Sequence, residues 1–225
     1  MAKSVPVRSG GNPRPPVGAG RTLIYIPILH TEADMGTLAG SVRRLAVAEL
    51  GRGAWNRNIE AIDRLWAHIR LTVESWPLPW KKVRLFQDGL AVCGRERQIV
   101  RALARAGSPN HQLLLSLMKR GATLVGTESP QLLVAEYRLV RMALAARESQ
   151  NAPRIQPNYS AESSRLLVRR DRYIARRING SLDAGETGIL FLGMLHQVVP
   201  RLARDLCVSY PIYRPPQVSL RSKPT

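Results

Sequence analysis

The sequence alternates short apolar runs with longer segments whose apolar residues recur at helical spacing, and this alternation constrains the fold more than any other feature. The short runs lack a regular polar alternation, as is typical of strands that are covered on both faces of a sheet. They span residues 23–29, 83–86, 122–125, 188–192 and 206–210. Strands separated by helices in this way predict an α/β domain with a largely parallel, helix-covered sheet.

Six longer segments carry the helical pattern. They span residues 37–50, 55–75, 95–106, 110–119, 130–147 and 160–179. The fifth has a clear start signal, because Ser129 is a favoured N-cap residue and Pro130 occupies the first helical position. Gly180 follows the sixth segment and is a typical stop signal.

Length and composition favour one globular domain with basic tails. The chain has 225 residues, of which 44% are hydrophobic and 22% are charged, which is enough apolar material for a single core. Residues 1–21 are rich in Gly, Pro and basic side chains, and residues 213–225 are similar. We therefore expect flexible tails around a domain at 22–212. Cys93 and Cys207 are far apart, which argues against a redox motif or a thiolate metal site.

The sequence also indicates where the protein works. Its longest apolar run, at 23–29, is far shorter than the roughly 20 residues that span a bilayer. The first 21 residues lack the apolar core of a signal peptide. We therefore expect a cytoplasmic protein without a membrane span.

Two of the four histidines follow predicted strands in similar local sequence. His30 ends Ile-Pro-Ile-Leu-His and His196 ends Leu-Gly-Met-Leu-His, with Pro27 and Gly193 three positions earlier. Ligands bind at the carboxyl ends of the strands in open α/β sheets, so both imidazoles are candidates for a site. The alternative is a pair of histidines that only hydrogen-bond to nearby backbone. The other two histidines lie in predicted helices and are interpreted as structural or solvated; they are His68 and His111.

Carboxylates follow the same strand ends. Glu128 comes after the predicted strand 122–125, and it is the strongest acidic candidate. Asp88 comes after 83–86, but Asp88-Gly89 is more typical of a tight turn than of a functional site. Two further acids, Glu32 and Asp34, follow His30 and are either solvated, helix-capping or functional. These residues should converge on one edge of the sheet.

Asp171 is a separate candidate, because it shares an apolar helical stripe with Leu167, Ile174 and Ile178. A carboxylate on a core-facing stripe must be paired, protonated or bound to a ligand. The structural alternative is an ion pair with Arg170 or Arg172. Glu136 flanks a similar stripe in the segment 130–147.

Two imidazoles with a carboxylate suit a divalent metal ion of the zinc or manganese type that activates water for hydrolysis. We predict His30, His196 and Glu128 as metal ligands, with Glu128 as ligand or general base. Asp171 would orient a histidine by hydrogen bonding, and Arg170 or Arg172 would contact an anionic group. The sequence contains no H-E-x-x-H motif, serine-nucleophile elbow or phosphate loop, so the ligands must come from distant segments.

These residues carry a resemblance to the TraB/PrgY/Tiki-type proteins. The stretch Arg170–Ile178, followed by Gly188–His196, is similar to the family's closing motif of a basic-acidic helix and a strand ending in Gly-x-x-His. His30 and Gly126-Thr127-Glu128 match its first histidine and its strand-end glutamate. Pro27 replaces the family's first glycine. The resemblance, which extends to ChaN-like and erythromycin-esterase-like proteins, implies an α/β fold and metal-dependent hydrolysis in some members.

The net charge supports a competing function. It is +18, from 34 Lys and Arg against 16 Asp and Glu, which predicts attraction to an anionic substrate, an acidic partner or nucleic acid. Arg97, Arg101 and Arg105 form a basic stripe on the segment 95–106. No recognised nucleic-acid motif accompanies the stripe, so nucleic-acid contact would be non-specific. The alternative is therefore a non-enzymatic basic binding protein.

Overall fold

The computed structural model describes residues 7–9, 20–148 and 157–212, which form an α/β domain around a six-stranded sheet. Every pairing in the sheet is parallel, and the strand order is β1-β6-β2-β5-β3-β4. The strands are β1 (Val7–Ser9), β2 (Arg21–Ile28), β3 (Val83–Gln87), β4 (Thr123–Val125), β5 (Thr187–Gly193) and β6 (Leu206–Tyr210). The predicted fold class is therefore confirmed.

Six α-helices and four short 3-10 helices connect the strands in the described residues. The α-helices are α1 (Ala39–Leu50), α2 (Arg52–Glu74), α3 (Glu96–Arg105), α4 (Pro109–Lys119), α5 (Pro130–Glu148) and α6 (Pro157–Ser181). Each coincides with a predicted segment to within a few residues. Pro130 is the first residue of α5, as its start signal predicted, whereas α6 continues one residue beyond Gly180.

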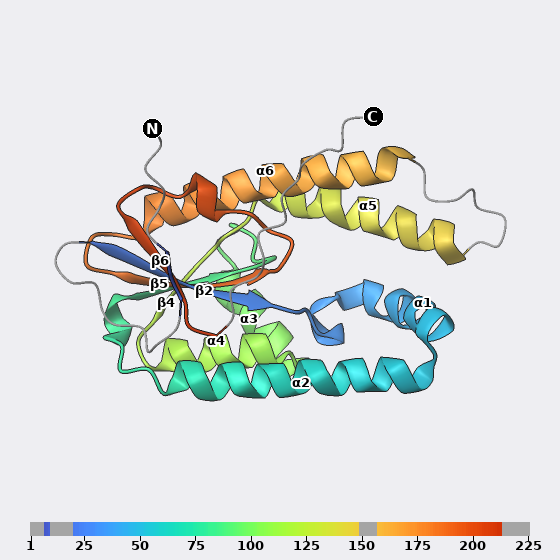
Figure 1. Cartoon of the computed structure of the whole chain (residues 1–225), viewed down its shortest axis with the longest axis horizontal. Helices are drawn as coiled ribbons and strands as arrows, with labels where there is room; N and C mark the ends of the chain where they lie inside the picture. Colours follow the sequence, from blue (N-terminus) through green and yellow to red (C-terminus); the bar gives the residue numbers. More distant parts are fainter. Residues whose placement is uncertain (1–6, 10–19, 149–156, 213–225) are drawn as a thin grey trace.

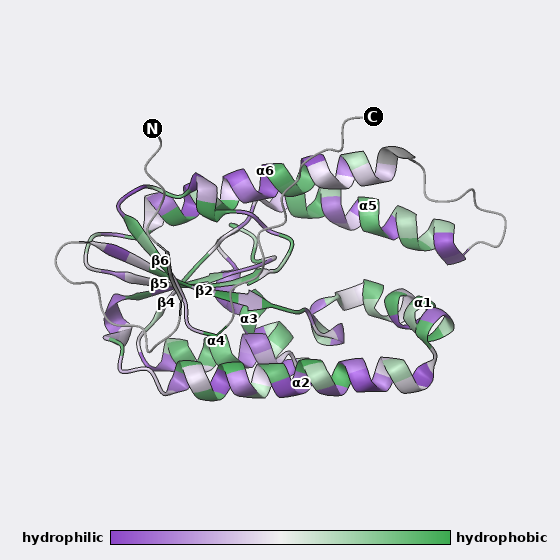
Figure 2. Ribbon diagram, viewed as in Figure 1, coloured by the Kyte–Doolittle hydropathy of each residue, from purple (hydrophilic) through white to green (hydrophobic). Residues whose placement is uncertain are grey.

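The helices cover both faces of the sheet, with α5 and α6 on one side and α2 and α4 on the other (Figure 1). Alternate strand residues therefore enter different cores. Leu23 and Tyr25 of β2 pack with Ile174 and Ile178 of α6, whereas Ile24 on the same strand packs with the opposite helices. The central strands β2 and β5 are accordingly buried along nearly their whole length. Figure 2 shows hydrophobic and hydrophilic residues alternating along α2, α5 and α6, as expected for helices with one face toward the sheet and one toward water.

The sheet has one strand that the sequence did not predict. Val7–Ser9, inside the expected N-terminal tail, pairs with β6 as the parallel edge strand β1. The rest of that tail, at 1–6 and 10–19, and the expected C-terminal tail at 213–225 lie outside the described residues. Among the helices that are described, none combines the length and the apolar character needed to cross a bilayer.

Candidate functional site

Four strands deliver polar side chains to one edge of the sheet. His30 lies two residues after β2, and Asp88 immediately follows β3. Glu128 and His196 each lie three residues after their strands, β4 and β5. Because all the strands are parallel, their carboxyl ends meet at this edge, which brings residues from four distant segments together.

Asp88, Glu128 and His196 form the centre of the cluster. One ligand atom from each lies within 4.8 Å of the others, and none of the three residues is more than 9% exposed. Nε2 of His30 lies 3.2 Å from Oδ2 of Asp88, and Nε2 of His196 lies 3.7 Å from Oδ1 of the same residue. Asp88 therefore faces both imidazoles. The side chain of His30 is 42% exposed and forms the outer side of the cluster.

The backbone holds Asp88 in place from two directions. Its own N–H donates to the carbonyl of Phe191, at 2.9 Å, which extends the contact between β3 and β5 beyond the strands. The N–H of Gly193 donates to Oδ2 of Asp88, also at 2.9 Å. A Cβ atom at residue 193 would lie 2.9 Å from that oxygen, so the carboxylate approaches this closely only because the residue is glycine.

Glu128 is positioned by the loop that follows β3. Its N–H donates to the carbonyl of Leu90 at 2.9 Å, and its carbonyl accepts from the N–H of Val92 at 2.8 Å. The N–H of Gly89 then donates to Oε1 of the Glu128 side chain at 3.1 Å. Two neighbouring strand-end loops thus hold each other, and this contact fixes the Glu128 carboxylate beside Asp88.

Arg170 joins the carboxylates from the middle of α6. Its Nε donates to Oε2 of Glu128 and its Nη2 to Oδ1 of Asp88, both at 2.8 Å, while Nη2 also contacts Oε1 of Glu128. Nη1 contacts Glu136 of α5. The guanidinium predicted to contact an anionic group thus contacts carboxylates of the protein itself. All three guanidinium nitrogens are engaged.

Asp171 pairs with His196 rather than with either neighbouring arginine. Its Oδ1 lies 2.6 Å from Nδ1 of the imidazole, and its Oδ2 accepts from the N–H of Gln197 at 3.0 Å. The predicted burial of Asp171 on the core-facing stripe is confirmed, because the residue is 2% exposed. Since Asp171 engages Nδ1, Nε2 of His196 is directed toward Asp88.

Burial and charge shift the proton affinities of the cluster in different directions. Burial raises the pKa of Glu128 above its ordinary value, and the hydrogen bonds from Arg170 only partly oppose this. Burial acts the same way on Asp88, but the His30 hydrogen bond and the charges of His196 and Arg170 hold its pKa well below the usual range. For His196, burial lowers the pKa, yet Asp171 and Asp88 together raise it.

Arg172 lies outside this cluster, so of the two arginines that were predicted as alternatives only Arg170 contacts it. Successive helical residues point about 100° apart, and α6 buries Arg170 and Asp171 while Arg172 is exposed. The periodicity located the buried stripe at Asp171, but it did not decide which neighbouring arginine accompanies it.

The remaining acids and histidines lie apart from the cluster. The side chain of Asp34 is buried beside Ser108 and His111 at the start of α4, with Nδ1 of His111 3.3 Å from its Oδ1. His68 is exposed on α2, so it is solvated as expected. Glu32 lies near Arg43, with 3.5 Å between the charged atoms.

Asp88 was predicted to be a turn residue rather than a member of the site. The turn interpretation is correct for the backbone, since Gly89 has a φ of 73°. The side chain nevertheless lies at the centre of the cluster. The signal that selected Glu128, a carboxylate directly after a buried strand, applied equally to Asp88.

No family model, curated protein or solved structure matches this chain in the comparisons with known proteins.

Proposed function

We propose that the chain is a metal-dependent hydrolase of the TraB/PrgY/Tiki type, with its active site at the carboxyl ends of the strands. The observation that carries the proposal is the convergence of ligand atoms from Asp88, Glu128 and His196 within 4.8 Å, deep in the domain. His30 and His196 would supply imidazole ligands and Asp88 a carboxylate. Glu128 would serve as a further ligand or as the general base.

The residues present fit a divalent cation of the zinc or manganese type. Three carboxylates contact the guanidinium of Arg170, those of Asp88, Glu128 and Glu136, and a fourth, that of Asp171, contacts His196. With neutral imidazoles the cluster is therefore strongly acidic, although the chain as a whole carries +18. Nitrogen and oxygen donors together suit zinc or manganese, and the excess negative charge favours a bound cation.

Each residue of the cluster would have a distinct role beside a bound ion. A bound ion would lower the pKa of a water molecule and polarise the bond to be cleaved. Glu128, whose pKa is raised by burial, would act as the general base or as a further ligand. Asp171 keeps Nε2 of His196 turned toward the centre. Arg170 prevents the carboxylates from moving apart, because it bonds to Asp88 and Glu128 simultaneously.

The competing function is a non-enzymatic basic protein that binds nucleic acid or an acidic partner. The observation in its favour is the stripe of Arg97, Arg101 and Arg105, all exposed on α3. Binding through such a stripe would be governed by phosphate charge and would weaken steeply with added salt. Under this alternative the acidic cluster would only stabilise the fold.

Hydrolysis assays on metal-reconstituted protein test the proposal. The full chain is stripped with a chelator, reloaded with Zn²⁺ or Mn²⁺, and assayed against chromogenic esters and anilides with neutral and anionic acyl groups. We expect hydrolysis that requires the metal and falls at least about 100-fold in Glu128→Gln, in line with the loss of a general base. His68→Ala is the control, because that exposed imidazole lies outside the cluster.

Metal-dependent turnover that is lost in Glu128→Gln and retained in His68→Ala would support the proposal. Turnover that is identical with and without metal, or identical in Glu128→Gln and the wild type, would overturn it. So would the absence of turnover in protein shown to contain the metal, combined with salt-sensitive binding of nucleic acid.

A further inference from the structure

A basic surface that is separate from the buried cluster lies on the outer side of α6. Arg169, Arg172, Tyr173 and Arg176 are spaced three and four residues apart, so they share one helical face. Arg170 and Asp171 point into the domain between them. The outer face borders a pocket of about 650 Å³ that also reaches the start of α5 and the segment after β5. Its lining consists of Ser129, Gln131, Leu132, Arg169, Arg172, Tyr173, Ala175, Arg176 and Arg201.

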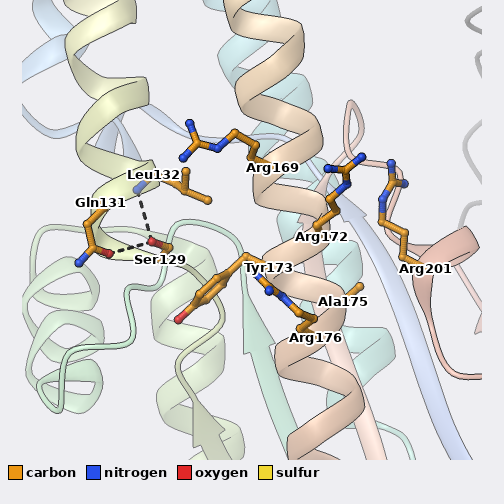
Figure 3. A pocket seen from close by; sticks show the side chains of 9 residues that line it. All are labelled: Ser129, Gln131, Leu132, Arg169, Arg172, Tyr173, Ala175, Arg176 and Arg201. Carbon is orange, nitrogen blue, oxygen red and sulfur yellow. Dashed lines mark hydrogen bonds between the residues drawn. The ribbon is translucent and has the colours of Figure 1, made fainter.

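The lining of the pocket is positively charged, and no acidic residue in it neutralises this charge. Four of its nine lining residues are arginines, and no lining residue is acidic. Among the described residues, no carboxylate lies within 4.0 Å of any of these four guanidinium groups. Figure 3 shows Arg172 and Arg201 on one flank of α6 and Arg169 extending toward Leu132 of α5. A ligand in this pocket would therefore meet guanidinium groups on both flanks.

Two of the arginines are held in position by the protein. Nη1 of Arg201 donates to the carbonyl of Gln197 at 2.7 Å. The guanidinium of Arg176 lies 5.8 Å from the ring centroid of Tyr173. In contrast, Arg169 and Arg172 make no hydrogen bond or ion pair within the described part of the chain, so their donors are fully available.

We propose that this pocket binds a small ligand that carries a chain of two or more phosphate groups. Guanidinium groups match phosphate oxygens in charge and in the spacing of their donors. The volume is within the range of roughly 300–1,000 Å³ that is common for small-molecule sites. Arginines on both flanks favour several linked phosphates over one. The beginning of α5 adds the positive end of a helix dipole at Ser129.

The binding experiment uses inorganic tripolyphosphate, pyrophosphate and orthophosphate as probes, titrated calorimetrically into the chelator-treated full chain. Metal is excluded because these probes chelate it. Two double variants with equal loss of charge are compared, Arg169→Ala/Arg172→Ala and Arg97→Ala/Arg101→Ala. All four side chains are exposed, so both variants should fold like the wild type, which thermal denaturation verifies.

We expect one tripolyphosphate per chain, with affinity decreasing to pyrophosphate and then to orthophosphate. Each pocket arginine should contribute about tenfold, so the pocket double variant binds about 100-fold more weakly. The α3 double variant should stay within about threefold of the wild type. Equal weakening of both variants, or no saturable 1:1 binding, would overturn the proposal. So would a short RNA that binds the wild type more tightly than tripolyphosphate and loses affinity equally in both variants.

A nucleoside triphosphate serves as the last probe and distinguishes the source of the phosphate chain. Tighter binding than tripolyphosphate, lost in Tyr173→Ala, would indicate a nucleotide whose base stacks on that ring, and equal affinity would indicate the phosphate chain alone. Both results support a phosphate pocket. Because the titrations use no metal and no turnover, their outcome is independent of the proposed hydrolase activity.

Discussion

Two buried Asp–His pairs in this protein look alike and lead to different conclusions. Asp171 lies 2.6 Å from Nδ1 of His196, and Asp34 lies 3.3 Å from Nδ1 of His111. Both histidines are almost inaccessible to solvent. The pairs differ in what surrounds them. Nε2 of His196 faces Asp88, whereas Nδ1 of His111 is also only 2.7 Å from the hydroxyl of Ser108.

The pair at the start of α4 is a closed set of hydrogen bonds. Asp34 accepts from the hydroxyl of Ser108 at 2.6 Å and from the N–H and hydroxyl of Thr31 at 2.8 and 2.9 Å. Asp34 is the one acid of that set, and its carboxylate is matched by these donors. The cluster around His196, by contrast, contains the only group of three or more potential metal ligands found in the described residues. Of the two pairs, only the one at His196 is accompanied by further carboxylates, those of Asp88 and Glu128, that are close enough to share a metal ion with it.

The largest predicted effect on stability comes from removing the positive charge of Arg170 from the cluster. Replacing Arg170 with Met leaves Asp88 and Glu128 buried together without their cation, so the free energy of unfolding should fall by about 3–5 kcal/mol. The matched variant Arg169→Met removes an exposed arginine one residue away and should change it by less than about 0.5 kcal/mol. Urea denaturation of both variants measures the difference. Similar small values would show that the cluster does not depend on Arg170.

Metal affinity should separate the two pairs directly. Asp171→Asn weakens the group that orients His196, so binding of Zn²⁺ or Mn²⁺ should fall by about 10–100-fold. Asp34→Asn alters the other pair in the same way and should leave the affinity unchanged. Calorimetric titration of both variants makes the comparison. An equal effect of the two substitutions would remove the distinction between the pairs.

The Asp34 pair should instead determine stability in acid. Burial alone would raise the pKa of Asp34, but hydrogen bonds from His111, Ser108 and Thr31 lower it from 3.8 to about 2. A carboxyl with a depressed folded pKa stabilises the protein above its unfolded pKa and loses this contribution as the pH falls through its folded pKa. The pair therefore contributes about 2 kcal/mol at neutral pH, lost between about pH 4 and pH 2.

Unfolding experiments across that window test the assignment. Asp34→Asn should be less stable than the wild type by about 2 kcal/mol at pH 7 and nearly as stable at pH 2. Parallel stability curves for the two proteins across the window would contradict the assignment.

The sequence predicted most of the helices and strands and the edge of the sheet where the cluster lies. These predictions succeeded because they depend on short stretches of sequence. Strands covered on both faces are apolar throughout, and residues after parallel strands converge. This reasoning located His30, Glu128 and His196. It could not rank Asp88, because an Asp-Gly turn accounts for the same two residues equally well. The direction of the Asp88 side chain follows only from its contacts with distant residues such as Gly193 and Arg170.

The choice of arginine and the edge strand could not be predicted, because both depend on contacts between residues that are distant in the sequence. Helical periodicity predicted the burial of Asp171, but it did not distinguish Arg170 from Arg172. Assigning Arg170 to the cluster required the positions of Asp88 and Glu128. The strand at Val7–Ser9 carries no local signal within a Gly- and Pro-rich segment. It is defined only by its pairing with β6.

A calorimetric titration of Zn²⁺ and Mn²⁺ into chelator-treated protein tests the central claim most directly. His30 is the best ligand to remove, since its side chain is 42% exposed and its loss should not disturb the core. We predict one ion per wild-type chain, a loss of at least about tenfold in affinity in His30→Ala, and no change in His68→Ala. No binding to the wild type, or equal affinity in His30→Ala, would contradict a metal centre at the strand ends.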